Sequence, residues 1–433
     1  MTPDHTTSPS RNRILVRAHQ GPFDNYSIVQ TAARQNLGAN VGNLLFSHSI
    51  YRLLGTAEAS LEVDRFKNTD PAWVNDNFDV VVLPLANAFR KNYVEELDKM
   101  SSIIERLRIP VVVAGVNAQL GLKANQPKGG IGAPVTRFVR AVLRNSPNIG
   151  VRGERTATYL RGLGFADDEL VVVGCPSMYT YGPDLPAPRL PEAITTDSRL
   201  SLNLSPYVPG IGELALAQAE KYPHLVYTAQ DLPTLGLLLT GRYRTHLPVR
   251  AGFPASLEHP LVSSGRTVMP VNVPSWLDHL AGFDFSYGTR IHGNIAAILA
   301  GTPAYVLAHD ARTAELAEYH AIPHRTVGKD IATLDAAELY AAADYTAMLT
   351  RHEATWAGFA SFLETHHLRS VYSPEAKPGN FDERISLIRY PPVATLQPHR
   401  RAQVLVTRVA VIVERLFKTA RYYTLKLLGR PTK

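Results

Sequence analysis

An arginine and a histidine stand close together where a strand pattern gives way to a helix pattern. The apolar and aromatic run Phe283–Tyr287 is typical of a strand, and Gly288 ends it. Arg290 and His292 follow on the two sides of one apolar residue, and a helix is expected over Asn294–Ala300. Open α/β sheets bind ligands at such strand ends, where the dipole of the next helix favours an anion. The turn therefore predicts an anion-binding site.

A second arginine has the same setting in the first half of the chain. Arg152 ends the expected strand Asn148–Arg152 and stands before the expected helix Glu154–Leu163. Arginine binds carboxylate and phosphate groups through paired hydrogen bonds. If the two strand ends face one cleft, Arg152 and Arg290 would suit a small ligand with two negative groups. For Arg152 taken alone, we favour the alternative of a surface arginine that caps a neighbouring loop.

Strand and helix patterns alternate along most of the chain and determine where these turns fall. The expected strands are Ile14–Ala18, Leu61–Phe66, Asp79–Leu85, Pro110–Val116, Asn148–Arg152, Leu170–Gly174, Leu200–Leu204, His224–Tyr227, Thr267–Val271, Phe283–Tyr287, Ala304–Ala308 and Arg325–Val327. Helical spacing fills the intervals between them. Runs as apolar as Asp79–Leu85 are typical of strands in a parallel sheet, buried on both faces. The pattern predicts the α/β class, with two Rossmann-like domains that face a cleft.

Proline-rich segments separate the expected domains, and Pro183–Pro191 is typical of a linker. The expected order is a disordered N-terminus at 1–11, a first Rossmann-like domain at 12–182, a linker at 183–199, a second Rossmann-like domain at 200–371, an irregular linker at 372–398 and a basic amphipathic tail helix at 399–433.

The length and composition of the chain narrow the class of protein. The chain has 433 residues, 45% of them hydrophobic, which suits two domains with large cores. Its single cysteine, Cys175, allows neither an intrachain disulfide nor a cysteine-based zinc site. The polar N-terminus lacks the apolar stretch of a signal peptide, and no window approaches the ~18 apolar residues of a membrane span. We expect a cytoplasmic protein.

The net charge of +7 belongs to the tail. Residues 399–433 contain nine Lys and Arg and one Glu, so this segment carries +8 and residues 1–398 carry −1. A nearly neutral body argues against nucleic acid as a partner. In the tail, Arg401, Arg408 and Arg415 recur over an apolar body, which is typical of a helix that lies on an anionic membrane surface, here the inner face. The alternative, a terminal helix packed across the domains, stays open.

Further polar residues have weaker signals. Asn40 and Asn43 lie in a Gly/Asn-rich loop that runs into a helix and could hold sugar hydroxyls, although we favour Asn43 as the N-cap of that helix. His48 on the same helix is expected to be structural, and Asp310 is expected to cap the helix after the strand Ala304–Ala308. The 15 histidines show no metal motif, and no Walker-type phosphate loop is present.

The segment Gly288–Ala304 resembles the signature of the polysaccharide pyruvyl transferase family. That signature is an Arg–apolar–His–Gly turn, a helix of small residues, then Gly-x-Pro and a strand. Gly150–Arg152, Val173–Ser177 and Gly38–Asn43 also resemble landmarks of the family. These segments occur in the family's order over roughly residues 30–330.

The resemblance implies a glycosyltransferase-B-like fold and a ketal pyruvyl transferase. Such an enzyme takes phosphoenolpyruvate as donor, needs no cofactor, and places pyruvate across two hydroxyls of a sugar. The ligand-binding residues of the family correspond to Arg152, Arg290 and His292. Two roles for His292 stay open: a general acid/base that protonates the methylene carbon, or a hydrogen-bond donor to phosphate.

The acceptor side is less defined. Asn40, Asn43 and Asn294 are candidate substrate-binding residues. The chain departs from the family at Gly42-Asn43, where Gly-Asp is common, and at Pro84–Ala88, where a glycine-rich turn is common. Both loops would line the acceptor site. A tail on the membrane would fit a sugar acceptor carried by a lipid.

Two alternative functions stay open. A glycosyltransferase that uses a nucleotide sugar would share the two-domain fold, and Asp310 or Glu315 could serve its ribose site. A non-catalytic, membrane-associated scaffold in glycan synthesis would need neither Arg290 nor His292 for its function.

Overall fold

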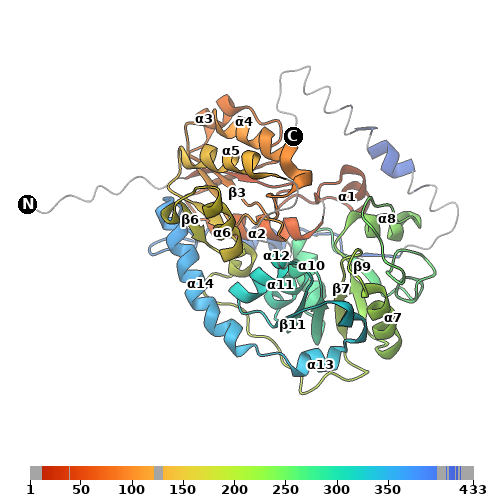
Figure 1. The fold of residues 1–433 in the computed structure, drawn as a ribbon. Helices are drawn as coiled ribbons and strands as arrows, with labels where there is room; N and C mark the ends of the chain where they lie inside the picture. The colour runs from red at the N-terminus through yellow and green to blue at the C-terminus, as the bar shows by residue number, and fades with distance from the viewer. Residues whose placement is uncertain are drawn as a thin grey trace, which may run out of the picture. The chain divides into compact units, whose positions relative to one another are not determined.

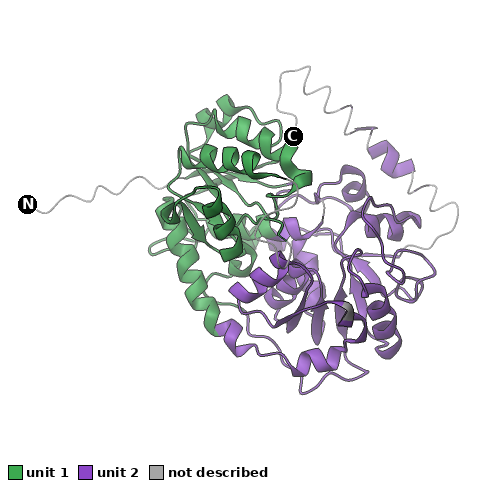
Figure 2. Cartoon of the chain, in the orientation of Figure 1, with its two compact units in different colours: residues 1–18, 46–185, 350–384 green, residues 19–45, 186–349, 385–433 purple. Residues whose placement is uncertain are grey.

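The computed structural model describes most of the chain as two compact units (Figures 1 and 2). The described residues are 12–38, 40–120 and 130–396, and in the tail 406, 409–414, 416, 417 and 420. Unit 1 consists of residues 1–18, 46–185 and 350–384, and unit 2 of residues 19–45, 186–349 and 385–433. The N-terminus predicted to be disordered, 1–11, lies outside the described residues.

Unit 1 is built on parallel strands. They are β1 (Arg13–Arg17), β2 (Ser60–Asp64), β3 (Val80–Leu83), β4 (Val111–Val113), β5 (Ile149–Val151) and β6 (Leu170–Val172). The order β2-β1-β3-β4 continues to β5-β6 through a bridge between Val116 and Val151. This is the strand order of flavodoxin-like doubly wound sheets. The valine-rich strands β3 and β4 are fully buried because helices cover both faces.

Seven helices belong wholly or partly to unit 1 among the described residues. They are α2 (Gly42–Leu54), α3 (Pro71–Asn77), α4 (Val94–Ile104), α5 (Gly132–Leu143), α6 (Glu154–Gly162), α14 (Thr346–Thr365) and α15 (Phe381–Leu387). The division between the units falls inside α2, α14 and α15. Single 3-10 turns lie at Lys91–Tyr93, Asp167–Glu169 and Pro176–Tyr179, and in unit 2 at Lys329–Thr333.

Unit 2 contains a seven-stranded sheet. Its strands are β7 (Leu200–Asn203), β8 (Val226–Thr228), β9 (Thr267–Met269), β10 (Phe285–Gly288), β11 (Ala304–Ala308), β12 (His324–Thr326) and β13 (Ala394–Thr395). The order is β12-β11-β10-β7-β8-β9-β13, and only β13 is antiparallel to its neighbour. The six parallel strands have the Rossmann order, and the chain reverses direction across the sheet between β7 and β10. The carboxyl ends of these two strands therefore flank the position where such sheets bind ligands.

Among the described residues before 350, eight helices lie wholly within unit 2. They are α1 (Ile28–Arg34), α7 (Ile211–Lys221), α8 (Leu232–Thr240), α9 (Pro260–Ser263), α10 (Val273–Leu280), α11 (Ile291–Leu299), α12 (Ala311–Tyr319) and α13 (Ala336–Ala341). The central helix α11 packs on β10 and β11 and lies between α10 and α12 (Figure 1). All nine residues of α11 are buried, because its Ile, Ala and Leu side chains face the core on every side.

The α/β class and the parallel sheets are confirmed, whereas the domain boundaries differ from the expected ones in two segments. Residues 19–45 belong to unit 2, because the backbone N–H of Val41 donates to Gln230 O at 2.9 Å. Residues 350–384 belong to unit 1, where Phe359 of α14 stacks on Tyr179 with ring centroids 4.8 Å apart. The shared cleft expected from the sequence concerns both units together and stays a prediction.

The segment 372–398, expected to be an irregular linker, has regular elements in its described part. It contains α15 and the edge strand β13, whose Ala394 pairs with Met269. Prolines in the surrounding sequence indicated irregular structure, and the two elements between them are too short to show a clear pattern.

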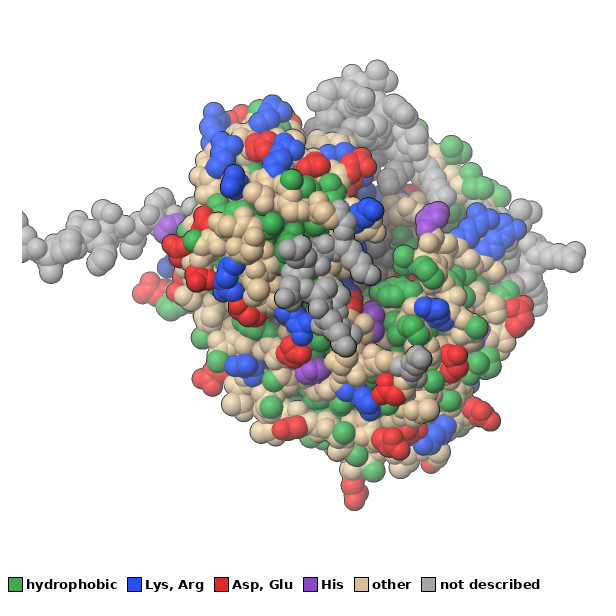
Figure 3. Space-filling view, viewed as in Figure 1, with side chains coloured by type: hydrophobic (Ala, Val, Ile, Leu, Met, Phe, Trp, Pro, Cys, Tyr) green, Lys and Arg blue, Asp and Glu red, His purple; other side chains and the backbone are tan. Residues whose placement is uncertain are grey.

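The described tail residues are helical, and Val406, Ile412 and Phe417 are exposed. Arg401, Arg408 and Arg415, the predicted basic stripe, lie outside the residues whose side chains are described. Among the described residues, no helix combines the length and apolar character that crossing a membrane requires. Acidic and basic side chains are interspersed on the face drawn in Figure 3, as the near-neutral charge of residues 1–398 leads one to expect.

Candidate functional site

The turn after β10 is held tightly against the end of β7. Gly288 has φ +143°, and a Cβ at this position would lie 1.9 Å from the backbone oxygen of Asn203. The backbone N–H of Thr289 donates to Asn203 O at 2.9 Å, and the N–H of Ser205 donates to Thr289 Oγ1 at 2.8 Å. Glycine is therefore required here for two reasons: its backbone conformation and the close approach of a neighbouring strand.

Arg290 is fixed by three hydrogen bonds to residues at the ends of β7 and β8. Its backbone N–H donates to Asn203 Oδ1 at 2.8 Å, its Nε donates to Leu204 O at 3.0 Å, and its Nη2 lies 3.3 Å from Asp231 Oδ2. The side chains of Arg290 and Asp231 are 17% and 10% exposed, so the pair is largely shielded from water. The Nη1 group has no hydrogen-bond partner among the described residues, and this leaves part of the guanidinium fork for a ligand.

His292 lies in the first turn of α11, because the helix begins at Ile291 rather than at the expected Asn294. The imidazole is 8% exposed. A Cβ added to Gly42 would lie 2.8 Å from both His292 Nδ1 and Asn40 Oδ1. Two groups far apart in the sequence, the Asn40 loop and the His292 helix, therefore meet in unit 2.

Asn40 and Asn43 have different local roles from those expected. Asn40 pairs with Asp231 through a backbone bridge, and its Oδ1 accepts a hydrogen bond from the N–H of Gly42 at 2.8 Å. Asn43 is wrong as an N-cap, because α2 begins at Gly42 and the Asn43 amide donates to Leu37 O at 3.3 Å. The cap-like hydrogen bond to the start of α2 comes instead from Asn40.

Asn294 is fully buried behind the turn. Its Nδ2 donates to Gly288 O at 3.1 Å, and its Oδ1 accepts hydrogen bonds from Asn203 Nδ2 at 2.8 Å and Ser286 Oγ at 3.3 Å. These bonds connect β7, β10 and α11. The substrate contact expected of Asn294 stays a prediction, and its geometry indicates that it positions Arg290 by holding Asn203.

Arg152 lies in unit 1, at the end of β5 and before α6, as the sequence predicts. The alternative of a surface arginine is wrong, because the side chain is 0% exposed. Its Nε donates to Gly115 O at 2.9 Å, and the guanidinium carbon lies 4.4 Å from the ring centroid of Phe46. Gly115 has φ +82°, and a Cβ there would lie 3.5 Å from Arg152 Cγ. The joint binding of one ligand by Arg152 and Arg290 stays a prediction.

Two tyrosines interact electrostatically with the Arg290–Asp231 pair: Tyr227, which is fully buried, and Tyr243, which is half-buried. Burial raises the pKa of Tyr227 and of Tyr243, and the Asp231 carboxylate raises both further while Arg290 opposes it. Both tyrosines therefore stay protonated at neutral pH. Both rings meet Phe253 edge-on, with ring centroids 5.8 Å and 5.9 Å apart.

Sequence reasoning missed the residues that hold Arg290. Asn203 ends β7, and Asp231 follows β8 and caps α8 by accepting a hydrogen bond from the N–H of Thr234. A signal was present, because each is a polar residue just beyond an apolar strand of the same sheet. Asp310 was correctly predicted as the N-cap of α12, with its Oδ1 2.8 Å from the N–H of Thr313.

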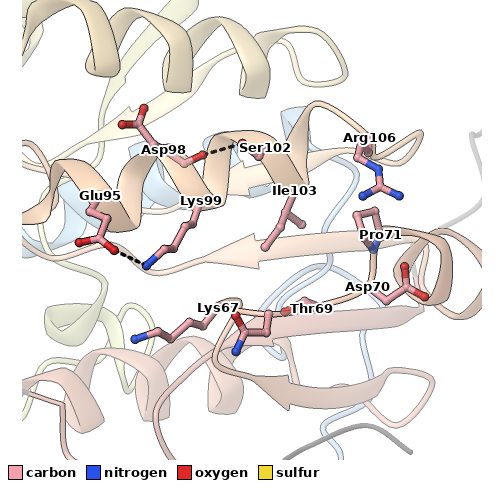
Figure 4. Close-up of a pocket in the computed structure, with 11 residues that line it drawn as sticks. Lys67, Thr69, Asp70, Pro71, Glu95, Asp98, Lys99, Ser102, Ile103 and Arg106 are labelled. Atoms are coloured by element: carbon pink, nitrogen blue, oxygen red, sulfur yellow. Dashed lines mark hydrogen bonds and ion pairs between the residues drawn. The ribbon is translucent and has the colours of Figure 1, made fainter. Parts of the chain in front are cut away.

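An open hollow of about 570 Å³ in unit 1 contains none of the predicted site residues (Figure 4). Two of its lysines form ion pairs: Lys99 contacts Glu95, also in the lining, at 2.6 Å, and Lys67 contacts Glu96, outside the lining, at 3.2 Å. Among the described residues, no three His, Cys, Asp or Glu side chains gather as metal ligands do.

The turn after β10 lies within a segment that matches a known protein family. Residues 256–311 match the family model described as polysaccharide pyruvyl transferase. The matched segment contains Arg290, His292 and Asn294, and the resemblance inferred from the sequence is confirmed over this segment. The match supports a transferase that acts in polysaccharide modification. No curated protein matches the chain.

Solved structures of similar fold share little sequence with the chain. A putative UDP-N-acetylglucosamine 2-epimerase from Listeria monocytogenes is 10% identical, with 87% of this chain and 94% of that chain covered and a TM-score of 0.42. The UDP-GlcNAc 2-epimerase from Neisseria meningitidis is 11% identical, with 87% and 98% covered and a TM-score of 0.39. The enzyme from Methanocaldococcus jannaschii is 12% identical, with 74% and 90% covered and a TM-score of 0.39. Similarity this low carries no functional argument.

Proposed function

We propose that the protein transfers pyruvate from phosphoenolpyruvate to two hydroxyls of a sugar in a glycan or glycolipid, forming a ketal. One observation carries the proposal: Arg290 and His292 lie within the family match, at the strand ends where a Rossmann sheet binds ligands. Phosphoenolpyruvate has a carboxylate and a phosphate group. Arg290 would bind one of them, and Arg152 of unit 1 is proposed as the second guanidinium.

The chemistry needs a proton at one carbon and two attacking hydroxyls. Protonation of the methylene carbon makes the adjacent carbon electrophilic, and the first sugar hydroxyl adds to it. Phosphate then leaves with the electron pair of its C–O bond, the second hydroxyl attacks the same carbon, and both hydroxyl protons are released. We assign the proton transfer to His292 in the first turn of α11. The residue is 8% exposed, so it is largely shielded from solvent. Asn40, close to His292, is proposed to contact the acceptor.

The test is an assay with phosphoenolpyruvate and a panel of extracted glycans and glycolipids. Wild-type protein should release phosphate and add one pyruvate ketal to an acceptor, as detected by mass spectrometry. Arg290→Ala and His292→Gln should each lower turnover by about 10²-fold or more, while His224→Gln, at an exposed histidine outside the site, should keep wild-type turnover. Near-normal turnover of both His292→Ala and His292→Gln would rule out acid/base catalysis by His292.

The same assay separates the competing functions. Transfer of a sugar from a nucleotide sugar, with no response to phosphoenolpyruvate, would identify a glycosyltransferase. Full complementation of a deletion strain by an Arg290→Ala, His292→Ala double variant would identify a non-catalytic scaffold. Asp310, a candidate for the nucleotide-sugar alternative, already caps α12 and contacts Arg312 at 3.2 Å, so the structure does not favour that function.

A further inference from the structure

A second arginine lies at the strand end next to that of Arg290. β11 is the parallel neighbour of β10, with Gly288 opposite Val306, and it leads through His309 and Asp310 into α12. Arg312 is the second residue of this nine-residue helix. The carboxyl ends of β10 and β11 therefore each place an arginine at the N-terminus of a helix, on the same edge of the sheet.

The two arginines share a neighbour, the imidazole of His309. Burial and the positive charges of Arg312 and Arg290 together lower the pKa of His309 to about 4, against the opposing effect of Asp310. Tyr207, just beyond β7, lies 3.4 Å from His309 Nε2 through its hydroxyl. His309 is therefore neutral at pH 7, and both guanidinium groups are near enough to affect its pKa.

Both arginines keep free donors although each contacts an aspartate. Arg312 Nη2 meets Asp310 Oδ2 at 3.2 Å, and Arg290 Nη2 meets Asp231 Oδ2 at 3.3 Å. These are single contacts rather than the parallel pairs that arginine makes with a fully engaged carboxylate. The Nε of Arg312 is buried and has no hydrogen-bond partner among the described residues.

An unpartnered hydroxyl lies beside Arg290. Ser205 follows Leu204, whose carbonyl oxygen accepts the hydrogen bond from Arg290 Nε. The Ser205 side chain is 1% exposed, and its Oγ has no hydrogen-bond partner among the described residues. A buried hydroxyl without a partner costs free energy, and a bound oxyanion beside Arg290 would remove that cost.

We propose that Arg312 is a second phosphate-binding residue, so that unit 2 alone binds a phosphate group between Arg290 and Arg312, with Ser205 as a further donor. This inference rests on the proposed function and deepens it, because it assigns the phosphate of the donor substrate and of the released product to one unit. The carboxylates of Asp231 and Asp310 hold the arginines in place and weaken anion binding by their charge.

Isothermal titration calorimetry of the full chain with inorganic phosphate tests the proposal. Arg312→Gln should weaken phosphate binding by about tenfold or more, the loss expected for one or two charge-assisted hydrogen bonds. The matched control is Arg325→Gln, an arginine of the same sheet that contacts Asp330 at 2.6 Å on an exposed strand, and it should leave the affinity unchanged. Equal phosphate affinity of wild type and Arg312→Gln, or no phosphate binding by wild type, would overturn the proposal.

A second variant works in the opposite direction. Asp310→Asn keeps an N-cap side chain for α12 but removes the negative charge next to Arg312, so phosphate should bind more tightly. Unchanged or weaker binding overturns the proposal even if Arg312→Gln fails to fold. Phosphate binding that depends on Arg312, without any pyruvyl transfer, would refute the proposed function and keep this inference. Pyruvyl transfer with an unchanged KM for phosphoenolpyruvate in Arg312→Gln would refute this inference and keep the proposed function.

Discussion

Gly288 shows how one residue determines the geometry of the candidate site. It allows β10 to end against the carbonyl oxygen of Asn203, and that contact brings Asn203 within hydrogen-bonding distance of the Arg290 backbone. Arg290 therefore receives its position from backbone geometry first and from its partner Asp231 second.

Gly288→Ala should lower the free energy of unfolding by about 2–4 kcal/mol, because the new methyl group combines a positive φ with a clash against a backbone oxygen. Urea unfolding at 25 °C measures this. The control is Gly358→Ala in the exposed middle of α14, where nothing lies within 4 Å of the new Cβ. That change should raise stability by about 0.5–1 kcal/mol, as expected for alanine in a helix. A loss at Gly288 no larger than an ordinary surface substitution would contradict the steric argument.

At the scale of elements, the strands were predictable and the contacts between distant segments were not. Runs such as Asp79–Leu85 and Ala304–Ala308 are apolar enough to identify buried parallel strands, and the turn with Arg290 follows directly from one of them. Nothing in the sequence links the Asn40 loop to His292, because that contact depends on the Val41–Gln230 backbone hydrogen bond. The same limit concealed α15, whose packing partner His48 lies far away in the sequence.

The packing of α2 against α15 makes an element-scale prediction about pH. His48 meets Phe381 edge-on at 5.1 Å, and burial, then the charge of Arg52, lower its pKa to about 4 against the opposing effect of Asp382. The unfolded chain binds a proton below pH ~6.5 that folded His48 does not accept until about pH 4. Stability therefore falls as the pH decreases through this window.

Chemical denaturation at pH 7 and pH 4 measures this contribution. The free energy of unfolding of wild type should fall by about 2–3 kcal/mol more between these two pH values than that of His48→Gln. The reason is that folding suppresses proton uptake by His48, and the variant lacks this group. His224→Gln, at an exposed histidine, should show the wild-type loss. Identical losses in wild type and His48→Gln would mean that His48 titrates normally in the folded protein.

At the scale of the whole molecule, charge and exposed apolar surface coincide at the carboxyl end. Residues 399–433 carry +8 while the rest of the chain carries −1. Among the described helical residues of this segment, several apolar side chains are 42–67% exposed: Val406, Val409, Ile412, Val413, Leu416 and Phe417. Their spacing of three and four residues places most of them on one helix face. Glu414, in the same segment, forms an ion pair with Arg34 of α1.

We predict that this segment binds anionic membranes, since basic residues near anionic lipid contribute about 1 kcal/mol each and the apolar face adds insertion. The full chain should float with vesicles that contain anionic lipid, and less so in high salt, because salt screens the charges. Deletion of 399–433 should abolish flotation. Ile412→Glu with Phe417→Glu should weaken it strongly, whereas Glu414→Gln, which leaves the apolar face intact, should not.

Equal flotation with neutral vesicles, or flotation that survives the deletion, would contradict the prediction and favour a tail that packs on the protein. Under the proposed function, a lipid-linked acceptor would lie at such a surface, so loss of flotation should also lower transfer to lipid-linked acceptors while transfer to soluble glycans stays unchanged.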